Sequence, residues 1–125
     1  MDQARIKTIL DRYREPAKHP RNYPDLHDHV LALAAAGKLI VIDEPVNKDT
    51  EMHPLVRWQF RGGLPESERK AFLFTNVTDS KGKHYDIPVV VGALAANREI
   101  YRIGLGCDLD KIEETWARAT AAPIK

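Results

Sequence analysis

Two short apolar runs organise the middle of the chain, residues 71–75 and 87–91, within the stretch A-F-L-F-T-N-V-T-D-S-K-G-K-H-Y-D-I-P-V-V-V. The segment between them is polar and rich in Thr, Asp, Ser and Gly, which are typical turn residues. This pattern predicts a β-hairpin whose connection is a loop and not a two-residue turn. Because both runs are almost free of charge, they predict strands that helices cover on both faces.

A third apolar run, residues 39–42, follows a stretch with helical periodicity. Asp25 stands at the N-cap position of that helix, and Gly37 stands where a left-handed residue after a helix belongs. Three aliphatic residues form the stripe that is expected to be buried: Leu26, Val30 and Leu33. We therefore expect an α/β fold, bordering on α+β, in which helices at both ends cover a small mixed sheet. Its three strands are expected at residues 39–42, 71–75 and 87–91.

Another helix is expected between the first two strands. Asp49 or Thr50 is its expected N-cap, Pro54 fits its first turn, and the pair Gly62-Gly63 ends it. Four apolar residues form its expected stripe: Met52, Leu55, Val56 and Phe60. The two strands and this helix make a crossover unit, which is right-handed if the strands are parallel neighbours. The following loop, L-P-E-S-E-R-K, is expected to be simply solvated.

An amphipathic helix is expected at the start of the chain, ending at Pro16. Its stripe consists of Ile6, Ile9, Leu10 and Tyr13. The segment 16–24 contains three prolines and no periodicity, which predicts a flexible connector more mobile than the sheet. Residues 1–24 are therefore set apart from a domain at 25–125. The first helix is expected to lie loosely or to pack on a neighbouring chain.

Two helices are expected after the hairpin, and both are expected to pack back on the sheet. Asn97 caps the first, and Gly104 and Gly106 end it. Asp108 is the expected cap of the second. Four residues form the stripe of that last helix: Leu109, Ile112, Trp116 and Ala119. The final residues, A-A-P-I-K, are neither highly charged nor rich in Gly and Ser, as a disordered tail would be. This favours a chain that continues beyond them.

Composition indicates the environment of the protein. Its 125 residues are expected to form one domain. Because 19 basic side chains stand against 18 acidic ones, no strong electrostatic field favours nucleic acid or an anionic membrane as a partner. A single cysteine, Cys107, excludes an internal disulfide and suits a reducing compartment. No apolar run approaches the ~20 residues of a membrane span, and the charged amino terminus is unlike a signal peptide. A cytoplasmic protein is expected.

Candidate chemistry is sparse. His27 and His29 resemble a metal pair, but two residues apart on a helix their side chains point about 200° from each other, which favours surface or helix-pairing roles. The G-L-G motif at 104–106 lacks the third glycine of a dinucleotide fingerprint, so helix-ending glycines are favoured. Cys107 stands beside Asp108, whose charge disfavours a reactive thiolate. We predict no catalytic, cofactor-binding or metal-binding residue.

Three residues are candidates for contact with another domain. Tryptophan is strongly enriched at buried interfaces, so Trp58 and Trp116 are candidates, against the alternative that each belongs to the core. Arg98 is the third, against the alternative of a solvated helix-surface arginine. The carboxylate pair Glu113-Glu114 is expected on a solvated face and not as an acid and base.

The serial order of these elements resembles the amino-terminal domain of UbiD-type decarboxylases. The stretch D-L-H-D-H-V-L-A-L-A-A-A-G-K-L-I-V-I-D-E-P-V precedes the helix at 52–61, A-F-L-F-T-N-V, I-P-V-V-V-G-A-L-A-A-N-R-E-I-Y-R-I-G-L-G and the helix with Trp116. That family shows a helix ending in A-G-E-L, a strand, an acidic turn, a helix, an L-L-F-x-N-V strand, a P-V-L-G-N strand and an R-x-R-x-A-x-x-L-G helix. The resemblance covers about residues 25–125. Departures are the first helix with its connector, the L-P-E-S-E-R insertion, and Ala93 where asparagine is common.

The resemblance implies a role within a larger enzyme. UbiD-type enzymes reversibly decarboxylate aromatic or α,β-unsaturated acids with prenylated FMN, held with a divalent metal and potassium in a flavin-reductase-like barrel that also carries the catalytic Arg and Glu. That barrel begins after Lys125, so none of these positions carries over to a residue here. The chain is expected to be a structural domain that is inactive and free of flavin alone. Its expected partner is the rest of its polypeptide or a sister subunit, and the parent is expected to be a homo-oligomer. The alternatives are a separate small subunit and a non-catalytic binding module.

Overall fold

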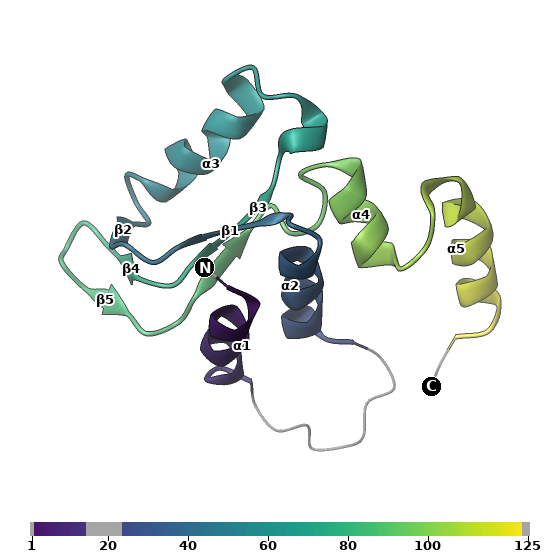
Figure 1. Cartoon of the computed structure of the whole chain (residues 1–125), viewed down its shortest axis with the longest axis horizontal. Coiled ribbons are helices and arrows are strands. Elements are labelled where there is room, and N and C mark those ends of the chain that lie inside the picture. The colour runs from purple at the N-terminus through teal and green to yellow at the C-terminus, as the bar shows by residue number, and fades with distance from the viewer. Residues whose placement is uncertain (1, 15–23, 124–125) are drawn as a thin grey trace.

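The computed structural model describes residues 2–14 and 24–123, and its elements are arranged around a small central sheet (Figure 1). All of the predicted connector 16–24 except Pro24 lies outside the described residues. The central sheet has three strands in the order β1-β3-β6, with β1 (Leu39–Ile42), β3 (Ala71–Phe74) and β6 (Val89–Val91). β1 pairs parallel to β3, and β3 pairs antiparallel to β6. The predicted mixed sheet of three strands is confirmed.

Helices cover both faces of this sheet, as the uncharged runs predicted. Phe72 and Phe74 point to the face that carries α3 (Met52–Arg61), with their ring centroids 5.9 Å apart. Leu73 points to the face covered by α1 (Gln3–Asp11) and α2 (Leu26–Ala35). Successive strand residues point to opposite faces, so a strand between two helical layers needs apolar residues at every position. All four β3 residues are buried.

A second small sheet, β2-β4-β5, was not predicted. It consists of β2 (Val46–Asn47), β4 (Val77–Thr78) and β5 (His84–Tyr85), and the last two lie within the predicted hairpin loop. The predicted strand 87–91 is too long, because Ile87 is 67% exposed and the strand begins at Val89. Pro88 has no N–H to donate to the ladder, which explains the later start.

The first helix packs on this domain, contrary to the loose or intermolecular placement that was expected. Ile6 and Leu10 are each 4% exposed and join Val30 and Leu73 in one core cluster. The Asp2 carboxylate accepts a hydrogen bond from the Arg5 backbone N–H and caps the helix, which ends at residue 11 and not at Pro16.

The second helix has the predicted ends. Asp25 and Asp28 form a capping box at its start, and Gly37 follows it with a φ of 69°. Leu26 is 55% exposed, however, so its predicted burial is wrong. It is the first residue of the helix, ahead of the turn that faces the sheet.

The prediction for α3 was wrong in two respects. Its N-cap is Glu51 without a side-chain cap bond, because the Asp49 carboxylate instead accepts the Ser80 backbone N–H at 3.0 Å. Leu55 and Phe60 are exposed, and the buried residues of the helix are Met52, Val56 and Gln59. Gln59 is polar, but its amide donates to the Lys70 carbonyl oxygen at 2.7 Å and accepts from the Lys70 N–H at 2.9 Å. The amide is therefore satisfied in the core, as burial of a polar group requires.

The fourth helix, α4 (Arg98–Leu105), is capped by Asn97 as predicted, through the Ile100 N–H at 2.8 Å. Gly106 ends it with a φ of 66°, but Gly104 lies inside the helix and is not a cap. An added Cβ at Gly104 would lie 3.3 Å from the His29 ring, so this glycine permits α2 to pack closely. The loop L-P-E-S-E-R-K, residues 64–70, is not simply solvated, because Glu66 Oε1 accepts the Arg98 N–H at the start of α4 at 2.7 Å.

The last helix does not pack on the sheet. A short 3-10 helix (Leu109–Lys111) precedes α5 (Ile112–Ala121), and the Asp108 side chain makes no cap bond. No residue of α5 is buried, and α4 lies between it and the sheet (Figure 1). The prediction that both final helices return to the sheet is correct only for α4, whose Ile100 is fully buried.

Candidate functional site

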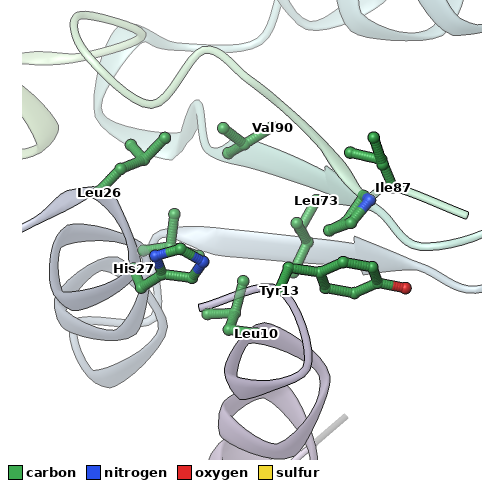
Figure 2. A pocket seen from close by; sticks show the side chains of 9 residues that line it. Leu10, Tyr13, Leu26, His27, Leu73, Ile87 and Val90 are labelled. Atoms are coloured by element: carbon green, nitrogen blue, oxygen red, sulfur yellow. The ribbon is translucent and has the colours of Figure 1, made fainter. Parts of the chain in front are cut away.

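An apolar pocket of about 160 Å³ lies where α1 and α2 meet the central sheet (Figure 2). Its floor consists of side chains that are at most 4% exposed: Leu10, Val30 and Leu73. Its mouth carries Leu26 and Ile87, which are 55% and 67% exposed. The remaining lining residues are Tyr13, His27, Pro88 and Val90. The site is therefore an apolar recess with two polar side chains.

Those two polar side chains differ in their partners. The Tyr13 hydroxyl donates a hydrogen bond to the Asp86 carboxylate at 3.4 Å. Burial, together with this carboxylate, holds the pKa of Tyr13 above its ordinary value, so the phenol remains protonated. The His27 ring turns from α2 toward the cavity, with Nδ1 3.7 Å from the Asp25 carboxylate (Figure 2).

Arg14, three residues after the end of α1, forms ion pairs with Asp25 and Asp28 at the start of α2, and we call this group the Arg14 clamp. Arg14 Nη2 donates to Asp25 at 2.9 Å and to Asp28 at 2.5 Å. The bond from Arg14 is the main reason why the pKa of Asp25 lies well below its ordinary range. The pKa of Asp28 is also lowered, chiefly by the Asp25 backbone N–H and then by Arg14. Both carboxylates are ionised at neutral pH, so charge-assisted hydrogen bonds tie Arg14 to the start of α2.

The structure does not bring the three predicted docking residues together. Trp58 lies on α3, Arg98 begins α4 and Trp116 lies on α5. Both tryptophans are outside the core, at 72% and 66% exposed. The Arg98 side chain is also exposed, with Nε 3.9 Å from Glu66.

The Trp58 side chain lies over the end of its own helix, although it is exposed. A Cβ built on Gly62 would lie 2.7 Å from the indole, so the ring lies directly over this glycine at the end of α3. Pro54, Arg57 and Arg61 line a shallow groove beside it. The exposed side of α3 at this groove therefore carries one aromatic side chain, Trp58, and two basic ones, Arg57 and Arg61.

The other candidate residues take structural roles. His29 Nε2 lies 2.6 Å from the Ala93 carbonyl oxygen, which joins α2 to the segment before α4. His27 lies at the pocket, so the two histidines have separate partners. Cys107 is a half-buried free thiol. Within residues 2–14 and 24–123, no group of three or more His, Cys, Asp or Glu side chains is arranged to hold a metal ion.

Sequence reasoning missed the pocket. Its lining comes from α1 with Tyr13 just after it, from α2, from β3, and from the segment that runs from Ile87 into β6, which are far apart in the chain. The one available signal was that Leu26 and Ile87 sit at the first position of their apolar patterns, where burial is least certain.

Comparison with known proteins shows which protein family the chain belongs to. Among the described helices, none is both long and apolar enough to cross a membrane. No solved structure gives a significant match to the chain. A family model for the 3-octaprenyl-4-hydroxybenzoate carboxy-lyase N-terminal domain matches residues 30–120, which confirms the resemblance read from the order of the elements. Because this match covers most of the 125 residues, the chain belongs to the UbiD N-terminal domain family.

Proposed function

We propose that this chain is the N-terminal structural domain of a UbiD-type enzyme that reversibly decarboxylates an aromatic or α,β-unsaturated carboxylic acid. The observation that carries the proposal is the family match over residues 30–120. The exposed α5 supports it, because a helix with an apolar stripe and no buried residue is suited to contact another domain. The domain is inactive alone and acts in the cytoplasm as part of a homo-oligomeric parent.

Prenylated FMN, with a divalent metal and potassium, belongs in this proposal to the barrel of the parent. Two observations on the described residues support this assignment. The apolar pocket, at about 160 Å³, is close in volume to a cavity that takes up one benzene ring, whereas isoalloxazine has three fused rings. At the start of α4, where a phosphate would find free N–H groups, Glu66 already accepts from Arg98.

The docking contacts in this proposal are Trp116 on α5, with Trp58 and Arg98 as separate contacts. Trp116 shares its stripe with Leu109 and Ile112, and the indole is 66% exposed. Buried aromatic side chains supply much of the energy of an interface. The partner is the rest of the same polypeptide, and the alternative is a sister subunit.

The test is to supply the chain and its longer parent with prenylated FMN, Mn²⁺ and K⁺. Release of CO₂ is then followed from a panel of benzoic and cinnamic acids. We expect activity and retained flavin after gel filtration for the parent, and neither for the 125-residue chain. Decarboxylation or flavin retention by the chain alone would overturn the proposal. The DNA after codon 125 distinguishes the partners: a continuing frame gives one polypeptide, and a stop codon beside a barrel-only gene gives a sister subunit.

A further inference from the structure

We propose that the apolar pocket between α1, α2 and β6 binds a small, uncharged aromatic ring that carries one hydroxyl group. This inference rests on the pocket alone and does not depend on the decarboxylase proposal.

The size of the pocket favours a single ring. Its volume is about 160 Å³, and an apolar protein cavity of roughly 150 Å³ stays dry and takes up benzene. The floor residues Leu10, Val30 and Leu73 belong to one core cluster and are fixed by packing. The recess is therefore preformed, so a ligand does not have to order it on binding.

The lining selects for a neutral ring with a polar substituent. Apolar atoms dominate the wall, and of the two polar side chains Tyr13 already donates to Asp86. The His27 imidazole faces the cavity and can bond a hydroxyl group (Figure 2). The Asp86 carboxylate lies 3.4 Å from the hydroxyl of Tyr13, which lines the pocket, so its charge disfavours an anionic ligand such as benzoate.

Two exposed apolar side chains, Leu26 and Ile87, form the entrance of the pocket. Leu26 and Ile87 come from different elements, and both line this pocket while more than half exposed. An apolar entrance above an apolar floor lets a ring pass from water to the recess without crossing a polar barrier. A bound ring would cover part of both side chains and gain their apolar contact.

The direct experiment is a titration of the ¹⁵N-labelled 125-residue chain, followed by ¹H–¹⁵N spectra, with phenol, toluene and benzoate as separate probes. We expect phenol to bind with a Kd on the order of 0.1–1 mM, which is usual for so few atoms. Shifts should centre on Tyr13, His27 and Val90. Toluene should bind several-fold more weakly than phenol, and benzoate should bind at least about tenfold more weakly.

Two variants test the site. Ile87→Asp places a charge at the mouth, and Leu94→Asp is its matched control, because Leu94 is 72% exposed and does not line the pocket. We expect Ile87→Asp to abolish the phenol shifts and Leu94→Asp to keep them. In His27→Ala the preference for phenol over toluene should fall to about one, which tests the hydroxyl partner even if Ile87→Asp misfolds.

Four results would each overturn the inference. The first two are an absence of shifts at about 10 mM phenol and phenol shifts in Ile87→Asp equal to those of the unchanged chain. The other two are benzoate binding as tight as phenol binding and an unchanged phenol preference in His27→Ala.

Discussion

The two terminal helices of this protein start from similar sequence patterns and end in opposite environments. α1 buries Ile6 and Leu10 against α2 and the sheet, each at 4% exposed. α5 buries no residue, and its Trp116 is 66% exposed. Both were expected to show an apolar stripe. The stripe therefore predicts which face of a helix is apolar, and it does not tell what covers that face.

The difference has a thermodynamic consequence. α1 and α5 have 9 and 10 residues, and helices shorter than about 12–15 residues are marginal in water without tertiary packing. α1 obtains that packing within the domain. α5 buries no residue, so we expect it to be only marginally stable as a helix in the isolated chain.

The largest expected effect is on the free energy of unfolding, and it distinguishes a residue of the sheet from a residue of α5. Phe74 is fully buried, so Phe74→Ala should lower the free energy of unfolding by ~3–5 kcal/mol. Glu114 lies on the exposed side of α5 and pairs with Lys111, just before the helix, at 3.9 Å and with Arg118 at 3.8 Å, so Glu114→Ala should cost about 0–1 kcal/mol. Urea denaturation midpoints at unchanged slope give both values. Equal losses would show that the Glu114 carboxylate is not a surface group.

The next effect compares the two helices directly. Leu10→Ala should lower the free energy of unfolding by ~2–5 kcal/mol, because it leaves a cavity in the cluster with Val30 and Leu73. Trp116→Ala should change it by no more than about 0.5 kcal/mol in the isolated chain, because the indole has no buried contact to lose. Differential scanning calorimetry can rank them. A Trp116→Ala loss as large as that of Leu10→Ala would mean that α5 packs within this domain.

The smallest effect depends on pH and concerns the clamp that ties α1 to α2. Hydrogen bonds from Arg14 lower the folded-state pKa of Asp25 below its unfolded value of about 3.9. The clamp therefore stabilises the fold above that pH, and this stabilisation is lost as the pH falls through the lower folded pKa. Asn also caps helices well, so Asp25→Asn removes the charge and keeps the cap.

We expect Asp25→Asn to unfold at a lower urea concentration than the unchanged chain at pH 7, with the difference shrinking below about pH 4. Glu114→Gln on α5 is the control, and its midpoint should follow that of the unchanged chain across the same range. A difference for Asp25→Asn that stays constant with pH would show that the Arg14 clamp does not act through its charge.

The sequence predicted the parts of the fold that depend on local chemistry. Asp25 and Asn97 begin helices and Gly37 and Gly106 stand at helix ends as expected, because caps and left-handed glycines act within one turn. The uncharged run at β3 likewise predicted a strand between two helical layers.

The parts that were missed depend on distant partners. Gln59 is buried because the Lys70 backbone meets both ends of its amide, which no periodicity reveals. The β2-β4-β5 sheet has strands of two residues, too short to give a pattern. The pocket is assembled from segments far apart in the chain.

Hydrogen exchange measured on the isolated chain by NMR tests the central contrast most directly: α1 is packed into this domain, whereas α5 has no buried residue. The account predicts slow exchange at Leu10, comparable to that at Leu73, because the two share one core cluster. It predicts exchange close to the unfolded rate at Trp116 and the rest of α5. Protection across α5 equal to that of β3, or exchange at Leu10 as fast as that at Trp116, would contradict it.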